Sequence, residues 1–178
     1  MGLDDIRTAV PDYAKDLRLN LGSVITTSSL EPDMAWGAAL TAALVSKNEY
    51  VIQNILEDAK EHLDDTLING AKTTAAIMSM SNVWYKFTDL IQDEEVKKLP
   101  AKLRINAIMN HGGINQALFE GWGLAASVVN ACAVCVNAHA TQMRKLNLDA
   151  QHIADIARIA AVVKAVSDTL SFEKIVSA

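Results

Sequence analysis

The segment GWGLAASVVNACAVCVNAHATQM, residues 121–143, indicates the fold class most directly. It contains no Asp, Glu, Lys or Arg, and its apolar residues recur at the three- and four-residue spacing of a helix. Its length would suffice to span a bilayer. However, Ala and Ser dilute its hydrophobicity, and it is interrupted by Asn130, Asn137, His139 and Gln142. We therefore predict a buried helical region and no membrane span.

The sequence outside this segment shows the same helical pattern, so we predict an all-α fold. The chain is 51% hydrophobic, has few β-branched alternating runs, and contains only 3 Pro and 8 Gly that would interrupt helices. Pro11 is expected to open a helix through Leu21, and Pro32 is expected in the first turn of another. Residues 110–113, Asn-His-Gly-Gly, are expected to form a turn before a long segment that begins near Asn115.

The size and charge of the chain limit its architecture and its partners. Its 178 residues can bury a core without disulfide staples, which indicates a single domain, 1–178. The net charge of -5, without a cluster of Lys or Arg, argues against nucleic acid as a partner, because phosphates need a basic surface. Gly is too sparse for a phosphate-binding loop, so we expect no bound cofactor. The acidic start lacks the apolar stretch of a secretory signal, and we expect a cytoplasmic protein.

An offset of 86 positions aligns two parts of the chain without gaps. Trp36-Gly37-Ala38-Ala39-Leu40 falls on Trp122-Gly123-Leu124-Ala125-Ala126, and Ser46, Glu49 and Gln53 fall on Cys132, Cys135 and His139. This predicts two related helical halves, an N-terminal repeat at about residues 30–90 and a C-terminal repeat at about residues 115–175 that carries the chemistry. Chance similarity between two alanine-rich helices is the alternative. The two Trp side chains are expected to be packing anchors.

The C-terminal repeat contains a C-x-x-C motif, Cys132-Ala133-Val134-Cys135, followed by His139. Spacings of three, four and seven residues bring the two thiols and the imidazole within about 60° of one another on a helix. Three interpretations are open at this point: a redox dithiol, a metal site, or two cysteines that pack in the core. Structural zinc usually takes four ligands from two separated pairs, and the chain has no second pair, so a metal site is the weaker specific interpretation.

A redox dithiol at this place needs a scaffold other than thioredoxin, because the chain shows no βαβ pattern around the motif. At a helix N-terminus, unpaired backbone N–H groups and the positive end of the helix dipole would stabilise a thiolate, which is the nucleophilic form of cysteine. We expect Asn130 to cap such a helix.

Glu120 lies twelve positions before Cys132-x-x-Cys135. Together with His139, this pattern resembles the active-site signature of the AhpD alkyl hydroperoxidases, which lie within the carboxymuconolactone decarboxylase-like superfamily. The resemblance runs from the Leu3 region to Ala165 or beyond, and it includes Val10-Pro11-Asp12-Tyr13-Ala14-Lys15-Asp16, Ala76-Ile77-Met78 and Leu103-Arg104-Ile105-Asn106. The added Glu and His spacing and the full-length similarity make it far more specific than a C-x-x-C alone.

The resemblance implies a homotrimer of an all-α fold with two related halves, acting as an antioxidant thiol peroxidase on organic hydroperoxides. Peroxynitrite and hydrogen peroxide are further candidate substrates. In the resembled family, the second cysteine of the motif, here Cys135, is oxidised to a sulfenic acid. The first, here Cys132, then closes the redox disulfide. His139 and Glu120 match the family's proton relay.

The same resemblance implies the source of electrons. Lipoyl groups on the acyltransferase of a 2-oxoacid dehydrogenase, in the dihydrolipoamide form, would reopen the disulfide, and dihydrolipoamide dehydrogenase would recharge them with NADH. Electrons could also pass to an AhpC peroxiredoxin. Two other functions stay as alternatives. One is a disulfide reductase or adaptor that barely reacts with peroxide itself, and the other is a non-catalytic helical scaffold with packed or zinc-bound cysteines.

The sequence departs from the family pattern at Val134, where AhpD members usually have a histidine. Valine neither transfers a proton nor donates a hydrogen bond. One interpretation is that Glu120 and His139 suffice for the relay, either directly or through a bridging water. The other is that the protein is a member of the family with a slower or otherwise different reaction. We favour the first of these interpretations.

The position of Glu120 in the sequence poses a geometric problem. A continuous helix would separate Glu120 from Cys132 by about 18 Å along its axis, which is too far for a direct relay. The chain is therefore expected to bend near Asn130. The alternatives are that Glu120 acts from a neighbouring subunit or through its helix-capping environment.

Overall fold

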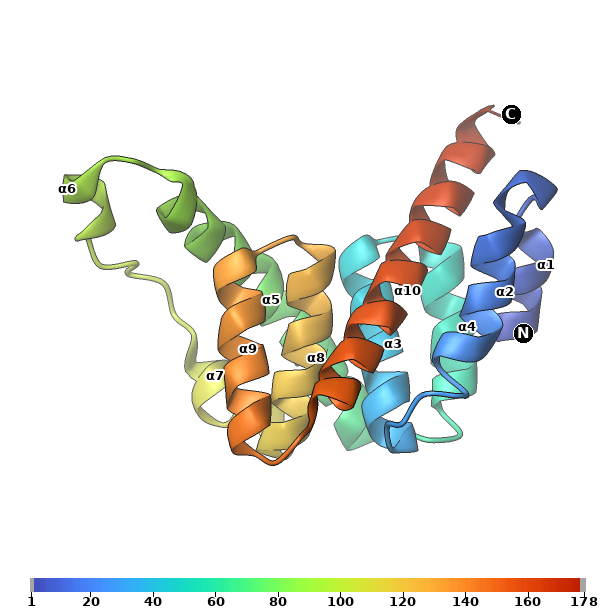
Figure 1. Cartoon of the computed structure of the whole chain (residues 1–178), viewed down its shortest axis with the longest axis horizontal. Coiled ribbons are helices and arrows are strands. Elements are labelled where there is room, and N and C mark those ends of the chain that lie inside the picture. Colours follow the sequence, from blue (N-terminus) through green and yellow to red (C-terminus); the bar gives the residue numbers. More distant parts are fainter. Residues whose placement is uncertain (1, 177–178) are drawn as a thin grey trace.

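The computed structural model describes residues 2–176, which form helices and their connecting segments (Figure 1). The helices are α1 (Leu3–Ala9), α2 (Lys15–Val24), α3 (Pro32–Ser46), α4 (Glu49–Ala59), α5 (Asp65–Leu90), α6 (Glu94–Lys97), α7 (Asn106–Met109), α8 (Gln116–Val129), α9 (Ala133–Lys145) and α10 (Ala150–Val176). Single 3-10 turns occupy Asp12–Ala14 and His111–Gly113. Residues 2–176 contain no strand, which confirms the all-α prediction. Within the same range, no helix combines the length and apolarity needed to cross a membrane.

The expected helix starts are confirmed at two of three places. Pro32 is the first residue of α3, and the Asn115 side chain accepts a hydrogen bond from Leu118 N at 2.9 Å and so caps α8. The helix expected from Pro11 to Leu21 is displaced: a 3-10 turn follows Pro11, and α2 begins at Lys15 and runs past Leu21. The interruption lies at Ala14, whose φ of -107° and ψ of 27° separate the turn from the regular helix.

The bundle is built around α3 and α8, which pack against each other at its centre (Figure 1). Helix α10 packs on both of them, α9 packs on α8, and α5 packs on α3 and α8 from another side. The close approach of α3 and α8 depends on Gly37, because a Cβ atom there would lie 2.0 Å from the Trp122 ring. Trp122 is fully buried, and its Nε1 donates a hydrogen bond to Met34 O at 3.2 Å. The prediction that it is a packing anchor is thus confirmed.

The two predicted repeats contain helices in the same order, α3–α4–α5 and α8–α9–α10. Shifted by 86 positions, α5 would span residues 151–176, compared with 150–176 for α10. In the first half, Trp36 is buried and its ring stacks on His62 with 5.2 Å between ring centroids, so it too is a packing anchor. A common origin of the two halves stays a prediction.

A segment that we call the arm, residues 83–109, projects away from the bundle (Figure 1). It comprises the end of α5, the short helices α6 and α7, and the chain between them. Its exposed large apolar side chains are Val83, Tyr85, Phe87, Leu90, Leu99, Leu103 and Met109. An apolar surface of this kind on a folded chain marks an interaction site.

Asp155 on α10 holds the segment before α3 against the bundle through hydrogen bonds. The buried carboxylate accepts hydrogen bonds from Ser29 N and Ser29 Oγ at 2.9 and 2.8 Å, from Gln151 Nε2 at 2.9 Å and from Arg158 Nη1 at 2.6 Å. Burial alone would raise the pKa of this carboxyl, but the hydrogen bonds from Ser29, Arg158 and Gln151 outweigh it and hold the pKa below the usual 3.8. Because the folded state favours the charged form of Asp155, this carboxylate stabilises the fold at pH values above the pKa that it has in the unfolded chain.

We expect Asp155→Asn to lower the free energy of unfolding by about 1–3 kcal/mol at neutral pH, because several donors lose a charged acceptor. The deficit should shrink as the pH falls through the folded pKa of Asp155, since the wild-type carboxylate then loses its own advantage. Urea denaturation across a pH series measures both effects. The exposed Asp89→Asn on α5 is the control and should change stability by less than about 0.5 kcal/mol. A deficit that stays constant down to acid pH would contradict the explanation.

Candidate active site

A tight turn folds α9 back on α8. Asn130 ends α8 with its N–H donating to Ala126 O, and Ala131 takes a left-handed conformation with φ 51°. Cys132 N donates to Ser127 O at 3.1 Å, and Cys132 then becomes the N-cap residue of α9. The chain therefore bends at the place that the sequence suggested.

The capping prediction was wrong, because Asn130 does not cap α9. The Cys132 Sγ atom accepts from Cys135 N at 3.4 Å in that role. Asn130 lies one residue before the left-handed Ala131, so its side chain faces α5 instead and donates to Asn82 Oδ1 at 3.0 Å. Cys132 and Cys135 are joined by a disulfide at the N-terminal end of α9, the end whose helix dipole favours a thiolate.

The turn brings Glu120 on α8 beside His139 on α9 within one chain. Glu120 Oε2 lies 2.7 Å from His139 Nδ1, and both side chains are buried. The contact needs neither a neighbouring subunit nor a helix-capping role for Glu120. The sequence analysis expected Glu120 and His139 to lie in one site with the dithiol, and the structure brings these two residues into contact.

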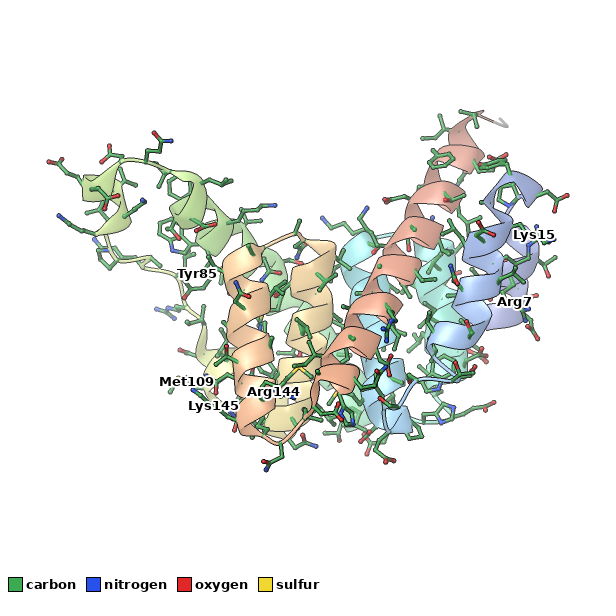
Figure 2. All side chains as sticks on the ribbon, in the orientation of Figure 1. Arg7, Lys15, Tyr85, Met109, Arg144 and Lys145 are labelled. Carbon is green, nitrogen blue, oxygen red and sulfur yellow. A yellow bond between two sulfur atoms is a disulfide. The ribbon has the colours of Figure 1, made fainter. Side chains whose placement is uncertain are left out.

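A cavity of about 240 Å³ opens beside this pair, and Cys135, His139 and Glu120 all line it. Its walls are mainly apolar and include Phe119, Ile108 and Ala138. Tyr85, in the part of α5 that belongs to the arm, also lines the cavity, and Figure 2 labels it next to α9. Cys135 is 6% exposed whereas Cys132 is fully buried, so a molecule that enters from outside meets Cys135 first.

Val134 also lines the cavity and is 42% exposed, so the position of the usual family histidine is at the solvent-facing rim. Glu120 and His139, which were expected to form the proton relay, contact each other without the help of residue 134. That this pair suffices stays a prediction. Within residues 2–176, no group of three or more His, Cys, Asp or Glu side chains is arranged to hold a metal ion.

Comparisons of the sequence with known proteins identify relatives of this chain. The model of the carboxymuconolactone decarboxylase family matches residues 94–176. A protein of Rhodospirillum centenum named alkyl hydroperoxide reductase AhpD is 45% identical over 99% of this chain and 95% of its own length. An alkyl hydroperoxide reductase AhpD of Streptomyces coelicolor is 42% identical over 100% of this chain and 99% of its own. The chain belongs to the AhpD family. The resemblance inferred from the sequence is confirmed.

In this AhpD-family chain, Gly123 is a site residue that the sequence analysis did not single out. A Cβ atom at this position would lie 2.6 Å from Cε1 and 2.8 Å from Nε2 of His139. Glycine therefore lets the imidazole lie against the backbone of α8, within reach of Glu120. The repeated Trp-Gly pair was a signal for it, since Gly37 makes the equivalent room for Trp122 in the core.

We expect Gly123→Ala to push the His139 ring away from Glu120 and to slow alkylation of reduced Cys135 by iodoacetamide at neutral pH about tenfold, because the Cys135 thiol loses the base that deprotonates it. Glu120→Gln removes the acidic partner of the imidazole without crowding and should slow alkylation similarly. Gly22→Ala on α2 is the control, since a Cβ there meets only the flexible end of Arg7. Unchanged alkylation in both site variants would remove the pair from thiol activation.

Proposed function

We propose that this protein is an antioxidant thiol peroxidase that reduces organic hydroperoxides through Cys132 and Cys135. The observation that carries the proposal is the shared cavity, which places Cys135 beside the buried His139–Glu120 pair and otherwise offers apolar walls. An apolar cavity suits the organic part of an alkyl hydroperoxide. The names of its relatives, alkyl hydroperoxide reductase AhpD, support the same activity.

In the proposed reaction, His139 takes the proton of the Cys135 thiol, and Glu120 stabilises the imidazolium that forms. The Cys135 thiolate attacks the terminal peroxide oxygen and the O–O bond breaks. The proton held by His139 passes to the departing alkoxide, which leaves as an alcohol. Cys135 is then a sulfenic acid.

Cys132 acts as the resolving residue. Its thiol attacks the Cys135 sulfenic acid, the S–O bond breaks, and water leaves as the disulfide forms. Two thiols and one hydroperoxide thus give one disulfide, one alcohol and one water. The structure contains a disulfide between Cys132 and Cys135, the bond that this step would form.

We propose dihydrolipoamide as the external reductant, carried by the lipoyl-bearing acyltransferase and recharged by dihydrolipoamide dehydrogenase. The 6% exposure of Cys135 supports a slender reductant, because a small dithiol on a flexible tether enters a narrow opening more readily than a dithiol held rigidly on a protein surface. Transfer of electrons to an AhpC peroxiredoxin is the second candidate, and the relatives' name, alkyl hydroperoxide reductase, fits a shared pathway of peroxide reduction. A cytoplasmic location stays a prediction.

We propose a homotrimer, with the arm as part of the contact between subunits. The arm carries exposed apolar side chains and projects from the bundle, as a segment that reaches a second copy would (Figure 1). Figure 2 shows Met109 at the outer side of α7, where it is 82% exposed. Burying side chains of this size against another chain would favour assembly by about 1.5–3 kcal/mol each.

The peroxidase proposal predicts the thiol count of the reduced protein. One equivalent of tert-butyl hydroperoxide should consume both thiols and yield one equivalent of alcohol without any partner protein, and dihydrolipoamide should restore both thiols. Cys132→Ser is the matched variant: it should lose one thiol and stop at the sulfenic acid, which a dimedone label detects by mass spectrometry. If both wild-type thiols persist, direct peroxidase activity fails and the adaptor function takes its place.

The homotrimer proposal predicts that Leu90→Glu combined with Leu99→Glu gives monomers, because two buried charges would lack partners. Light scattering after size exclusion gives the mass, and circular dichroism checks that the helices persist. Leu19→Glu, on exposed α2 away from the arm, is the control and should keep three chains together. A monomeric wild-type protein, or a trimeric double variant, would refute the role of the arm.

A further inference from the structure

Met78 on α5 contacts the second ring nitrogen of His139. Its Sδ atom lies 3.4 Å from His139 Nε2, and both side chains line the cavity with Cys135. The imidazole is therefore held on two sides, by Glu120 at Nδ1 and by Met78 at Nε2. Met78 is 3% exposed and comes from an element far from the motif in the sequence.

Both groups that face the imidazole are hydrogen-bond acceptors. An ionised carboxylate accepts only, and a thioether sulfur accepts weakly and has no proton to donate. A neutral imidazole carries one N–H and can satisfy only one of them, whereas an imidazolium carries two. Around the closed disulfide, each ring nitrogen of His139 thus faces an acceptor, Glu120 at Nδ1 and Met78 at Nε2.

Asn82, one turn further along α5, keeps the thioether in place. Its Nδ2 lies 3.9 Å from Met78 Sδ and donates to Ser127 Oγ at 3.0 Å, while its Oδ1 accepts from Asn130 Nδ2 at 3.0 Å. Asn82 is fully buried. The face of α5 that carries Met78 is thereby fixed against the turn that carries the dithiol.

We propose that Met78 is a positioning residue for His139, whose thioether holds the Nε2 proton while the disulfide is closed and releases it when the disulfide is reduced. This inference rests on the proposed dithiol chemistry. A weak acceptor suits the role, because it orients the N–H without competing strongly for the proton. A carboxylate or amide oxygen at the same place would retain it.

The proton has a defined destination in the reduction step. A thiolate of the external dithiol attacks Cys135 Sγ, the disulfide breaks, and Cys132 leaves. The second sulfur of the dithiol then displaces Cys135 and closes the external disulfide. The Cys135 thiolate takes the Nε2 proton of His139, which leaves the imidazole neutral. Of the two protons that the dithiol gives up, one ends on the Cys132 thiolate and the other enters the solvent, from which Nε2 takes a proton again when the disulfide next closes. Two electrons pass from the dithiol to the protein disulfide.

The first test is the protonation of His139 in the oxidised wild-type protein, observed by NMR after labelling the histidine nitrogens with ¹⁵N. We expect N–H signals from both ring nitrogens at neutral pH. Met78→Leu keeps the side-chain volume but removes the acceptor, and exchange of the Nε2 proton with water should become about tenfold faster, as for a lost hydrogen bond to a charged group. Met78→Gln offers a stronger acceptor and should slow that exchange.

The second test is the rate at which dithiothreitol reduces the disulfide, expressed relative to wild type across a pH series. Met78→Leu should be about tenfold slower near neutral pH and should approach the wild-type rate at about pH 5, where imidazole is protonated without help. Met78→Gln should also be slower, because it retains the proton. Met80→Leu, on the same helix but not among the residues that line the cavity, is the control and should match wild type in both tests.

A wild-type imidazole with a single N–H would overturn the proposal without any variant. So would a Met78→Leu protein whose proton exchange and pH profile match wild type. Neither measurement involves a hydroperoxide. Failure of the peroxidase function would therefore appear in the thiol count alone and would leave these results to be judged separately.

Discussion

The left-handed turn at Ala131 is the constraint on which the site depends. It reverses the chain between α8 and α9, so that a carboxylate and an imidazole nineteen positions apart meet at 2.7 Å. The same reversal makes Cys132 the N-cap residue of α9 and directs the helix dipole toward the dithiol. Without it, α8 and α9 would continue as one helix, and the four site residues would be spread along its length.

The packing around that turn explains why α8 carries such small residues. Gly121 and Gly123 face opposite neighbours: a Cβ at Gly121 would lie 2.4 Å from Met34 Sδ, and one at Gly123 would overlap the His139 ring. Close packing in protein interiors leaves no space for such additions. The segment therefore lacks large side chains at the points where its neighbours approach most closely, and it serves as both core and active-site wall.

Much of the candidate site could be predicted from the sequence, because Cys132, Cys135 and His139 lie at helical spacing and Glu120 lies only twelve positions before them. The bend near Asn130 followed from distance alone, since no straight helix could bring Glu120 to the dithiol. The wrong capping residue shows the limit of that reasoning. Cap preferences identify suitable side chains, but the residue that takes the cap depends on where the left-handed conformation falls, and Ala131 carries no signal for it.

The contributions of α5 lay outside the reach of sequence reasoning for a different reason. Met78 and Asn82 lie more than forty positions from His139 and read as ordinary positions of an alanine-rich helix. Only tertiary packing brings them to the site. The arm was missed because its apolar side chains follow the same pattern as buried ones, and periodicity does not distinguish a face that packs on its own chain from one that packs on another.

Helix α5 is one continuous rod of 26 residues that both lines the cavity and begins the arm. Met78 and Leu90 are about 18 Å apart along its axis, with no proline or kink between them. Any displacement imposed on the arm by a neighbouring chain would therefore be transmitted as a rigid shift to the wall that holds His139. The rate of catalysis per subunit would then depend on protein concentration, because dilution that separates the subunits would lower the activity of each one.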